Sequence, residues 1–207
     1  LAPVMCARRH LSFLAKLPKG RAMIMSLSEV WHKTRNPVIP GLEETHLTGE
    51  SDRMTAIRKF TRNKLAVGLF GANCDGGLAC STFPERWEAT WDNCRELAVQ
   101  ADDAGIDFML PLGRWIGYGG ETNHNGSNFE TIAWASGLLA ATKNIMAFGT
   151  VHVTAHSPAV AAKQMVTADH IGGGRFGLNI VCGWYQKEFD MLGVDLGEHE
   201  RRYDLGQ

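Results

Sequence analysis

The other predicted elements of this chain are arranged around the sequence 172-GGGRFGLNIVCGW-184. Its first three glycines end a helical segment, because glycine reaches the left-handed conformation without Cβ strain. Residues 176–182 then form a strand that is apolar except for Asn179, which is typical of a parallel strand covered on both faces. The amide of Asn179 needs a hydrogen-bond partner, and a neighbouring strand, water or a ligand could supply it.

Strand and helix patterns alternate on both sides of this stretch. The predicted earlier strands cover residues 65–70, 106–110 and 145–151. The predicted helices start near Thr82, Ser127, Ser157, Gln186 and Glu200. The first two starts are capping boxes, because Glu85 and Glu130 each follow a hydroxyl residue by three positions.

Alternating strands and helices predict a parallel α/β sheet with right-handed crossovers. A closed (β/α)8 TIM barrel needs roughly 200–250 residues, so the four predicted units make about the first half of one, truncated. Open strand edges in such a half-barrel favour self-association, and we expect a homo-oligomer. The alternative fold is a small doubly wound sheet, complete as it stands.

The chain divides in charge and pattern near residue 62. Residues 1–60 hold ten Lys/Arg and five Asp/Glu, whereas residues 61–207 hold eleven and seventeen. We predict a poorly ordered or non-native leader over 1–62 and the N-terminal half of a barrel over 63–207. Because the chain begins with Leu, a mis-started reading frame with Met25 or Met54 as the true start is preferred over a transit peptide.

Composition excludes several classes of protein. No apolar run approaches the roughly 20 residues of a membrane-spanning helix, so no membrane partner is predicted. The acidic body argues against nucleic-acid binding. Five cysteines without a C-x-x-C pair indicate neither a disulfide framework nor a zinc knuckle, and a reducing compartment, the cytoplasm, is expected.

Most familiar motifs are absent from the sequence. The glycine runs lack the G-x-G-x-x-G order of a dinucleotide site, and there is no G-x-S-x-G element or P-loop. His152 and His156 have no acid at ligand spacing, so no metal site is predicted. Unusual residues instead follow the predicted strands, where a barrel gathers its chemistry. Arg114 and Arg202 there would suit an anionic ligand such as a phosphate.

Several stretches together resemble one enzyme family. They are 173-GGRFGLNIVCGW-184, Gly113-Arg114 with 117-GYGG-120, 150-TVH-152, Glu188 and Arg202-Tyr203. This set is similar to the bacterial luciferase-like flavin monooxygenases, especially the branch with the pyrimidine, dimethyl sulfone and alkanesulfonate monooxygenases. The resemblance covers residues 64–207.

The resemblance implies a (β/α)8 barrel that uses FMN as FMNH2, with O2 as co-substrate. A separate NAD(P)H:flavin reductase would be the partner, and the substrate would be a small organosulfur or N-heterocyclic molecule. The implied cofactor-binding residues are Gly113, Arg114, Thr150, Asn179, Glu188, Arg202 and Tyr203. His152, at the end of a strand, is the candidate catalytic residue, and the backbone over 150–152 would face the isoalloxazine, with a cis peptide bond in some members of the family.

Two other functions remain open within the same fold. One is a deazaflavin-dependent oxidoreductase that transfers hydride. The other is a non-catalytic flavin-binding module, which would hold flavin without consuming O2 in response to a substrate.

Overall fold

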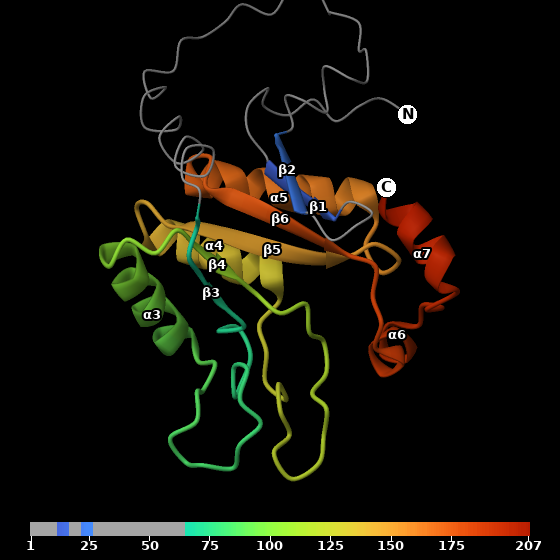
Figure 1. Cartoon of the computed structure of the whole chain (residues 1–207), viewed down its shortest axis with the longest axis horizontal. Helices are drawn as coiled ribbons and strands as arrows, with labels where there is room; N and C mark the ends of the chain where they lie inside the picture. The colour runs from blue at the N-terminus through green and yellow to red at the C-terminus, as the bar shows by residue number, and fades with distance from the viewer. Residues whose placement is uncertain (1–11, 17–21, 27–64) are drawn as a thin grey trace, which may run out of the picture.

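The computed structural model describes residues 12–16, 22–26 and 65–207. Their strands form one sheet in the order β2-β1-β6-β5-β4-β3 (Figure 1). The parallel strands are β3 Gly68–Phe70, β4 Phe108–Leu110, β5 Met146–His152 and β6 Phe176–Val181. These four are neighbours in the sheet in the order in which they occur in the chain. A doubly wound sheet would reverse that order at a switch point, so the arrangement is the (β/α)8 type that the sequence predicts.

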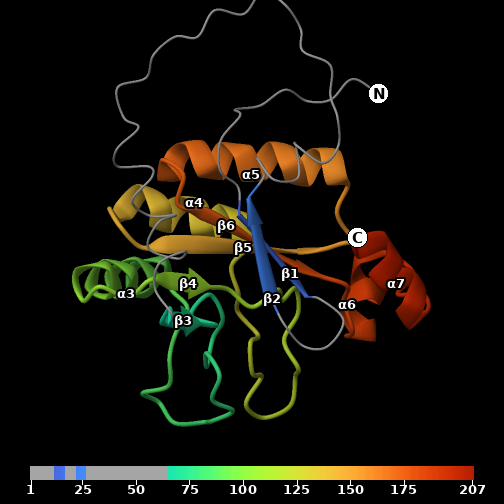
Figure 2. The same cartoon turned by 45° about the horizontal axis from the view of Figure 1, so that its top comes forward.

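The three long helices lie on one face of the sheet. They are α3 Trp91–Asp103, α4 Thr131–Ala141 and α5 Pro158–Gly172. Figure 2 shows them stacked side by side, and α4 packs against both α3 and α5. Helices that alternated between two faces could not touch in this way, which again excludes the doubly wound alternative. Two short helices, α6 Gln186–Leu192 and α7 His199–Gly206, follow β6.

The outer edge of β6 pairs with a hairpin from the N-terminal segment. Strands β1 Ser12–Lys16 and β2 Ala22–Ser26 are antiparallel to each other, and β1 runs parallel to β6 with Leu14 opposite Asn179. The sequence pattern predicted no strand over 1–62, so this hairpin was not expected. An unpaired strand edge offers free N–H and C=O groups, which explains why an extended segment pairs there. The rest of the predicted leader lies outside the described residues, and the domain boundary at residue 62 stays a prediction.

The core lies between the sheet and the helix layer. Its fully buried side chains include Met109, Leu138, Leu139, Phe176 and Leu178. Burying one such side chain contributes about 1.5–3 kcal/mol, so this layer fixes the positions of the strand ends.

Helix α5 begins and ends as the sequence predicts. Ser157 is its N-cap residue and Pro158 its first residue. Gly173 ends it in the left-handed conformation, with φ 60° and its N–H directed to the carbonyl oxygens of Asp169 and His170. The glycine run therefore turns the chain from α5 into β6.

The predicted start of α3 is wrong. The helix begins at Trp91, after an N-cap at Thr90, and not near Thr82. Residues 82–89 are held instead by the loop after β3. The indole of Trp87 donates to the carbonyl of Ala72 at 2.9 Å, and the N–H of Ala89 donates to the carboxylate of Asp75 at 2.7 Å. These contacts span 14 or 15 positions in the chain, and the local capping pattern contains no sign of them.

The predicted capping box of α4 also needs correction. Glu130 is itself the N-cap residue, and its carboxylate accepts from the N–H groups of Ile132 and Ala133 at 3.0 and 2.7 Å. Ser127 lies before the helix. The carboxylate replaces the predicted hydroxyl because it reaches two free N–H groups of the first turn at once.

The amino end of the sheet is closed by two charged residues. The carboxylate of Asp102 accepts from the N–H groups of Lys143, Asn144 and Ile145, at 2.7–3.2 Å. The guanidinium of Arg175 donates to the carbonyl oxygens of Leu139, Thr142 and Ile145. Both residues fix the turn from α4 to β5, at the face of a barrel that usually serves stability.

Candidate active site

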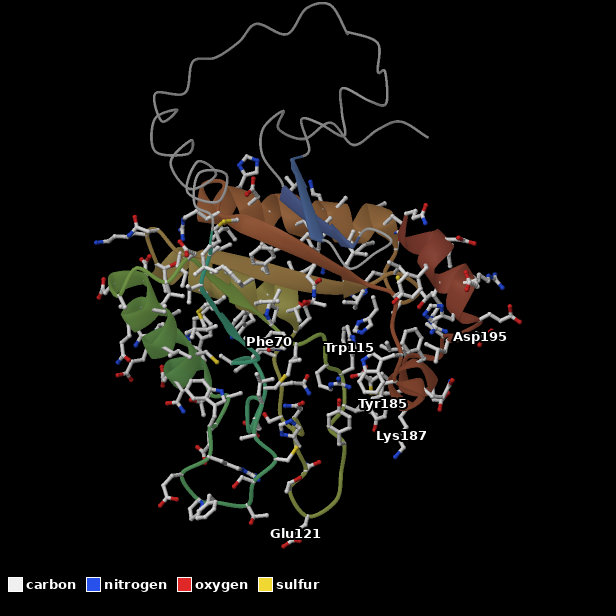
Figure 3. All side chains as sticks on the ribbon, viewed as in Figure 1. Phe70, Trp115, Glu121, Tyr185, Lys187 and Asp195 are labelled. Atoms are coloured by element: carbon white, nitrogen blue, oxygen red, sulfur yellow. The ribbon has the colours of Figure 1, made fainter. Side chains whose placement is uncertain are left out.

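The predicted site residues gather where the parallel strands end. Gly113 and Arg114 follow β4, Thr150 and His152 end β5, and Asn179 lies in β6. Figure 3 labels Trp115 and Tyr185, which come from the segments after β4 and β6; the two segments meet here, since the guanidinium of Arg114 lies 5.4 Å from the ring centroid of Tyr185. In a (β/α)8 sheet this is the face that carries the chemistry.

Four of the predicted residues are in direct contact. A Cβ atom on Gly113 would lie 2.7 Å from Cγ2 of Thr150 and 3.0 Å from Cε1 of His152, so only glycine fits there. The Oγ1 of Thr150 donates to the carbonyl of Pro111 at 3.2 Å and accepts from Nδ2 of Asn179 at 3.3 Å. We call Gly113, Thr150, His152 and Asn179 the strand-end cluster. The amide of Asn179 thus has a partner on the neighbouring strand.

His152 is buried and electrically neutral. Its side chain is 4% exposed, and its Nδ1 has no hydrogen-bond partner among the described residues. Burial, with a smaller effect of His156 and Arg114, lowers the pKa of His152 to about 4. A neutral imidazole can donate from one ring nitrogen and accept at the other, so His152 has hydrogen-bonding capacity left for a bound molecule.

Arg114 and Glu188 form a buried ion pair. Nη1 of Arg114 lies 3.2 Å from Oε1 of Glu188, which also accepts from the N–H of Trp115 at 2.8 Å. The guanidinium also lies over the rings of Tyr118, Trp184 and Tyr185, at 4.7, 5.4 and 5.4 Å from their centroids. The charge of Arg114 is therefore already balanced, and the two predicted flavin contacts bind each other. Their contact with flavin stays a prediction.

Arg202 and Tyr203 lie on α7 and are placed differently. Arg202 is 8% exposed and donates to the carbonyls of Gly197 and Leu196 at 2.7 and 3.4 Å, while its Nε has no partner among the described residues. No carboxylate forms an ion pair with it in the part of the chain that the structure describes. Tyr203 is 46% exposed and contacts the ring of His199, with centroids 4.5 Å apart. Of the two predicted arginines, Arg202 is thus the one whose charge is uncompensated within residues 65–207.

Sequence reasoning missed Thr131 as a residue of this face. Its Oγ1 donates to the carbonyl of Thr150 at 2.6 Å and accepts from the N–H of Thr150 at 3.0 Å. A threonine at the start of a helix gives no sign that it bonds to a strand 19 positions later.

Asn73 follows β3 and has a structural role. It is fully buried, donates to the carbonyls of Leu112 and Phe129, and accepts from the N–H of Leu112. These bonds tie together the segments after β3 and β4 and the start of α4. The side-chain amide is satisfied within the chain and does not need a ligand.

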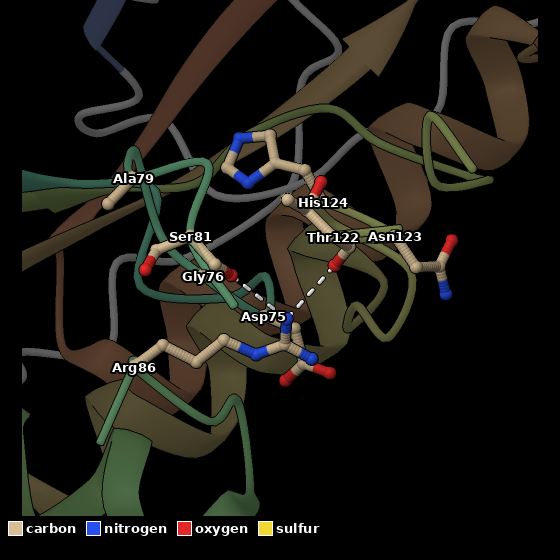
Figure 4. Close-up of a pocket in the computed structure, with 8 residues that line it drawn as sticks. All are labelled: Asp75, Gly76, Ala79, Ser81, Arg86, Thr122, Asn123 and His124. Carbon is tan, nitrogen blue, oxygen red and sulfur yellow. Dashed lines mark hydrogen bonds between the residues drawn. The ribbon is translucent and has the colours of Figure 1, made fainter. Parts of the chain in front are cut away.

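A pocket between two loops lies apart from the strand-end cluster. It holds essentially no room for a water molecule and is lined by residues of the loops after β3 and β4 (Figure 4). Nη1 of Arg86 spans it, donating to the carbonyls of Ser81 and Thr122 at 3.1 and 3.0 Å. Because its guanidinium is engaged by the loops themselves, we interpret this pocket as a packing gap and not as a ligand site.

Three further features bear on the predictions. All peptide bonds of the described residues are trans, so the cis bond that the family resemblance raised for 150–152 does not occur here. Within the described ranges, no group of three His, Cys, Asp or Glu side chains is arranged to hold a metal ion. No helix in those ranges is long and apolar enough to cross a membrane.

A parallel sheet with its strands in chain order and its helices on one face defines a (β/α)8-type scaffold. The family profile described as luciferase-like monooxygenase matches residues 70–206. The chain belongs to the luciferase-like monooxygenase family, as the sequence motifs predicted.

Three relatives are each longer than this chain. Pyrimidine monooxygenase RutA of Escherichia coli O139:H28 (strain E24377A / ETEC) is 29% identical over 172 residues, which is 79% of this chain and 44% of the relative. A crystal structure of riboflavin lyase RcaE with modified FMN and riboflavin is 26% identical, with a TM-score of 0.59 over 69% of this chain and 35% of that one. EDTA monooxygenase EmoA from Chelativorans sp. BNC1 shares the fold, with a TM-score of 0.61 at 19% identity over 70% of this chain and 36% of that one. The chain thus spans less than half the length of these relatives.

Proposed function

We propose that this chain carries part of the reduced-flavin site of a monooxygenase. FMNH2 would bind at the carboxyl ends of β4, β5 and β6, and one oxygen atom from O2 would enter a small organic substrate. A separate NAD(P)H:flavin reductase would supply the reduced cofactor. Membership of the luciferase-like monooxygenase family supports this proposal, as does the riboflavin lyase structure, which contains a modified FMN.

The observation that carries the proposal is the strand-end cluster. Gly113 has no side chain, so Thr150 and His152 pack directly against its backbone, and His152 leaves a buried Nδ1 without a partner among the described residues. A buried polar atom without a partner costs about 1–3 kcal/mol, which a hydrogen-bonding ligand can recover. These residues therefore fit a flavin with polar edges.

Reduced flavin, when bound, supplies the electrons that activate O2. The residues of this chain would then hold the cofactor and exclude water from it. We assign the flavin phosphate to Arg202, because its guanidinium is buried and no carboxylate of the described residues neutralises it. Arg114 and Glu188 would act on flavin indirectly, because their ion pair holds the loop after β4 that would lie against it.

The substrate is proposed to be a nitrogen heterocycle or a small organosulfur compound. The name of the RutA relatives, pyrimidine monooxygenase, favours the first of these.

The four cysteines that the structure describes are free thiols, which suits the cytoplasm as the proposed location.

An anaerobic titration of the purified chain with FMNH2 tests the proposal. We expect saturable binding in the wild type and weakened binding in Gly113→Ala, because the added Cβ would collide with Thr150 and His152. Gly119→Ala is the control in the same loop: its Cβ meets nothing within 4 Å, and at φ +73° it reports the effect on binding of left-handed backbone strain alone, roughly 1 kcal/mol.

Substrate and O2 then separate the alternatives. O2 uptake that increases when uracil or dimethyl sulfone is added supports a monooxygenase. Flavin binding without such uptake would indicate a non-catalytic flavin module. Binding of a deazaflavin in preference to FMN would indicate a hydride-transferring oxidoreductase.

A further inference from the structure

Thr131 connects the helix layer to the strand-end cluster through two hydrogen bonds. Its hydroxyl donates to the carbonyl of Thr150 at 2.6 Å and accepts from the N–H of the same residue at 3.0 Å. Both residues are buried, at 5% and 3% exposure. One side chain thus satisfies both backbone polar groups of one strand residue.

The geometry of the sheet explains why Thr150 needs this partner. The ladder between β4 and β5 ends at the pair Met109 and Ala147, and β4 itself ends at Leu110, before Pro111. The N–H and C=O of one residue in a strand point to the same side. Those of Thr150 point away from β6, to the side where β4 has ended. Without Thr131 they would be buried and unpaired, which is costly.

Helix capping does not account for the Thr131 hydroxyl. Glu130 caps α4, with its carboxylate bound to the N–H groups of Ile132 and Ala133. The hydroxyl of Thr131 also lies 3.4 Å from that carboxylate, a longer contact than the 2.6 Å bond to Thr150. A hydroxyl has a single proton to donate, and the shorter bond takes it.

Every polar group of Thr150 is thereby fixed. Thr131 holds its backbone, while Pro111 and Asn179 bind its Oγ1. This leaves the Cγ2 methyl group directed to Gly113. One hydroxyl from the start of α4 therefore helps to hold Thr150 in its place within the strand-end cluster.

We propose that Thr131 is a positioning residue of the flavin site: through the backbone of Thr150 it sets the surface against which the flavin ring would lie. This inference rests on the proposed function. The hydroxyl does not contact the cofactor itself, and its effect on binding passes through Thr150.

The test compares three variants of the full chain. Thr131→Val removes the hydroxyl and keeps the shape of the side chain, and Thr131→Ser keeps the hydroxyl. Thr142→Val is the matched control, because Thr142 lies just beyond the other end of α4, is 7% exposed, and bonds through its Oγ1 to the carbonyl of Leu138 at 2.8 Å. Thr142 also accepts from Arg175, so its loss weakens the fold away from the strand-end cluster.

Three readouts are made on each variant: amide hydrogen exchange at Thr150, the Kd for FMNH2, and the melting temperature. We expect Thr131→Val to speed exchange at Thr150 and to raise the Kd roughly tenfold, the scale of one lost buried hydrogen bond. Thr131→Ser should restore both, and Thr142→Val should change neither while lowering the melting temperature.

The outcomes separate this inference from the proposed function. Unchanged exchange at Thr150 in Thr131→Val would overturn the positioning role even if the wild type binds flavin. An equal rise of the Kd in Thr142→Val would also overturn it, by showing a general loss of stability. Failure of the wild-type chain to bind flavin would overturn the proposed function and, with it, the role of Thr131 in the flavin site.

Discussion

The guanidinium of Arg114 and the carboxylate of Glu188 meet at 3.2 Å, although 74 residues separate them in the chain. The pair links the loop after β4 to α6. The N–H of Trp115, in the same loop, also donates to this carboxylate oxygen. Both side chains are almost fully buried. A buried ion pair therefore holds the loop after β4 against α6, next to the proposed site at the carboxyl edge of the sheet.

Replacing Glu188 should destabilise the chain strongly. Glu188→Gln leaves the guanidinium of Arg114 buried without a counter-charge, and breaking a buried pair in this way costs about 3–5 kcal/mol. Urea unfolding measures this loss. Asp190→Asn, on the exposed side of the same helix, should cost less than about 0.5 kcal/mol. Equal losses in the two variants would show that the ion pair does not hold the loop.

Gly183 should tolerate no side chain. It lies between β6 and α6 with φ +81°, and a Cβ there would lie 2.2 Å from the ring of Phe189. Gly183→Ala should therefore cost more than the roughly 1 kcal/mol of left-handed backbone strain. Gly193→Ala separates the two effects, because Gly193 has φ +66° and open space around its Cα. Thermal unfolding should rank Gly183→Ala well below Gly193→Ala, and equal melting temperatures would contradict the contact with Phe189.

The stability of the chain should depend on pH through His152. Its pKa of about 4 in the folded state lies below the 6.5 of a free histidine, so the unfolded chain binds more protons between these values. The contribution of neutral His152 to the free energy of unfolding is then fully present above pH 6.5. It is lost as the pH is lowered toward 4, by up to about 3 kcal/mol. The measurement is the free energy of unfolding against pH, compared between the wild type and His152→Gln. The same slope in both would show that His152 is not the group responsible.

Asp102 should make the stability of the chain depend on pH in a more acidic range than His152 does. Burial raises the pKa of its carboxyl group, but the N–H groups of Lys143, Ile145 and Asn144 lower it more, and the net shift is downward. A lowered pKa stabilises the fold above the unfolded value of about 3.9, and this stabilisation is lost as the pH falls through the folded value. Asp102→Asn should cost about 1–3 kcal/mol at pH 7. The difference in melting temperature from the wild type should shrink below pH 4; a constant difference would contradict this origin.

The sequence predicted the fold well where the signal is local. The strand around Asn179, the start of α5 at Ser157-Pro158 and its end at the glycines all depend on residues next to each other. The start of α3 was wrong because Trp87 and Ala89 are held by the loop after β3, which replaces helical bonds over residues 82–89.

The site was predictable in its location but not in its bonds. Strand ends mark the face of a barrel, and family motifs marked Gly113, Thr150 and His152, which do lie in contact. The pairing of Arg114 with Glu188, and of Thr131 with Thr150, depends on contacts that only the packed fold creates. A single sequence carries no local sign of either.

The decisive experiment is the anaerobic titration of the wild-type chain with FMNH2. We expect saturable binding with a Kd on the order of micromolar, about 8 kcal/mol of binding free energy, and weaker binding in Gly113→Ala than in Gly119→Ala. Absence of saturable binding, or equal affinities in the two glycine variants, would contradict a flavin site at the ends of these strands.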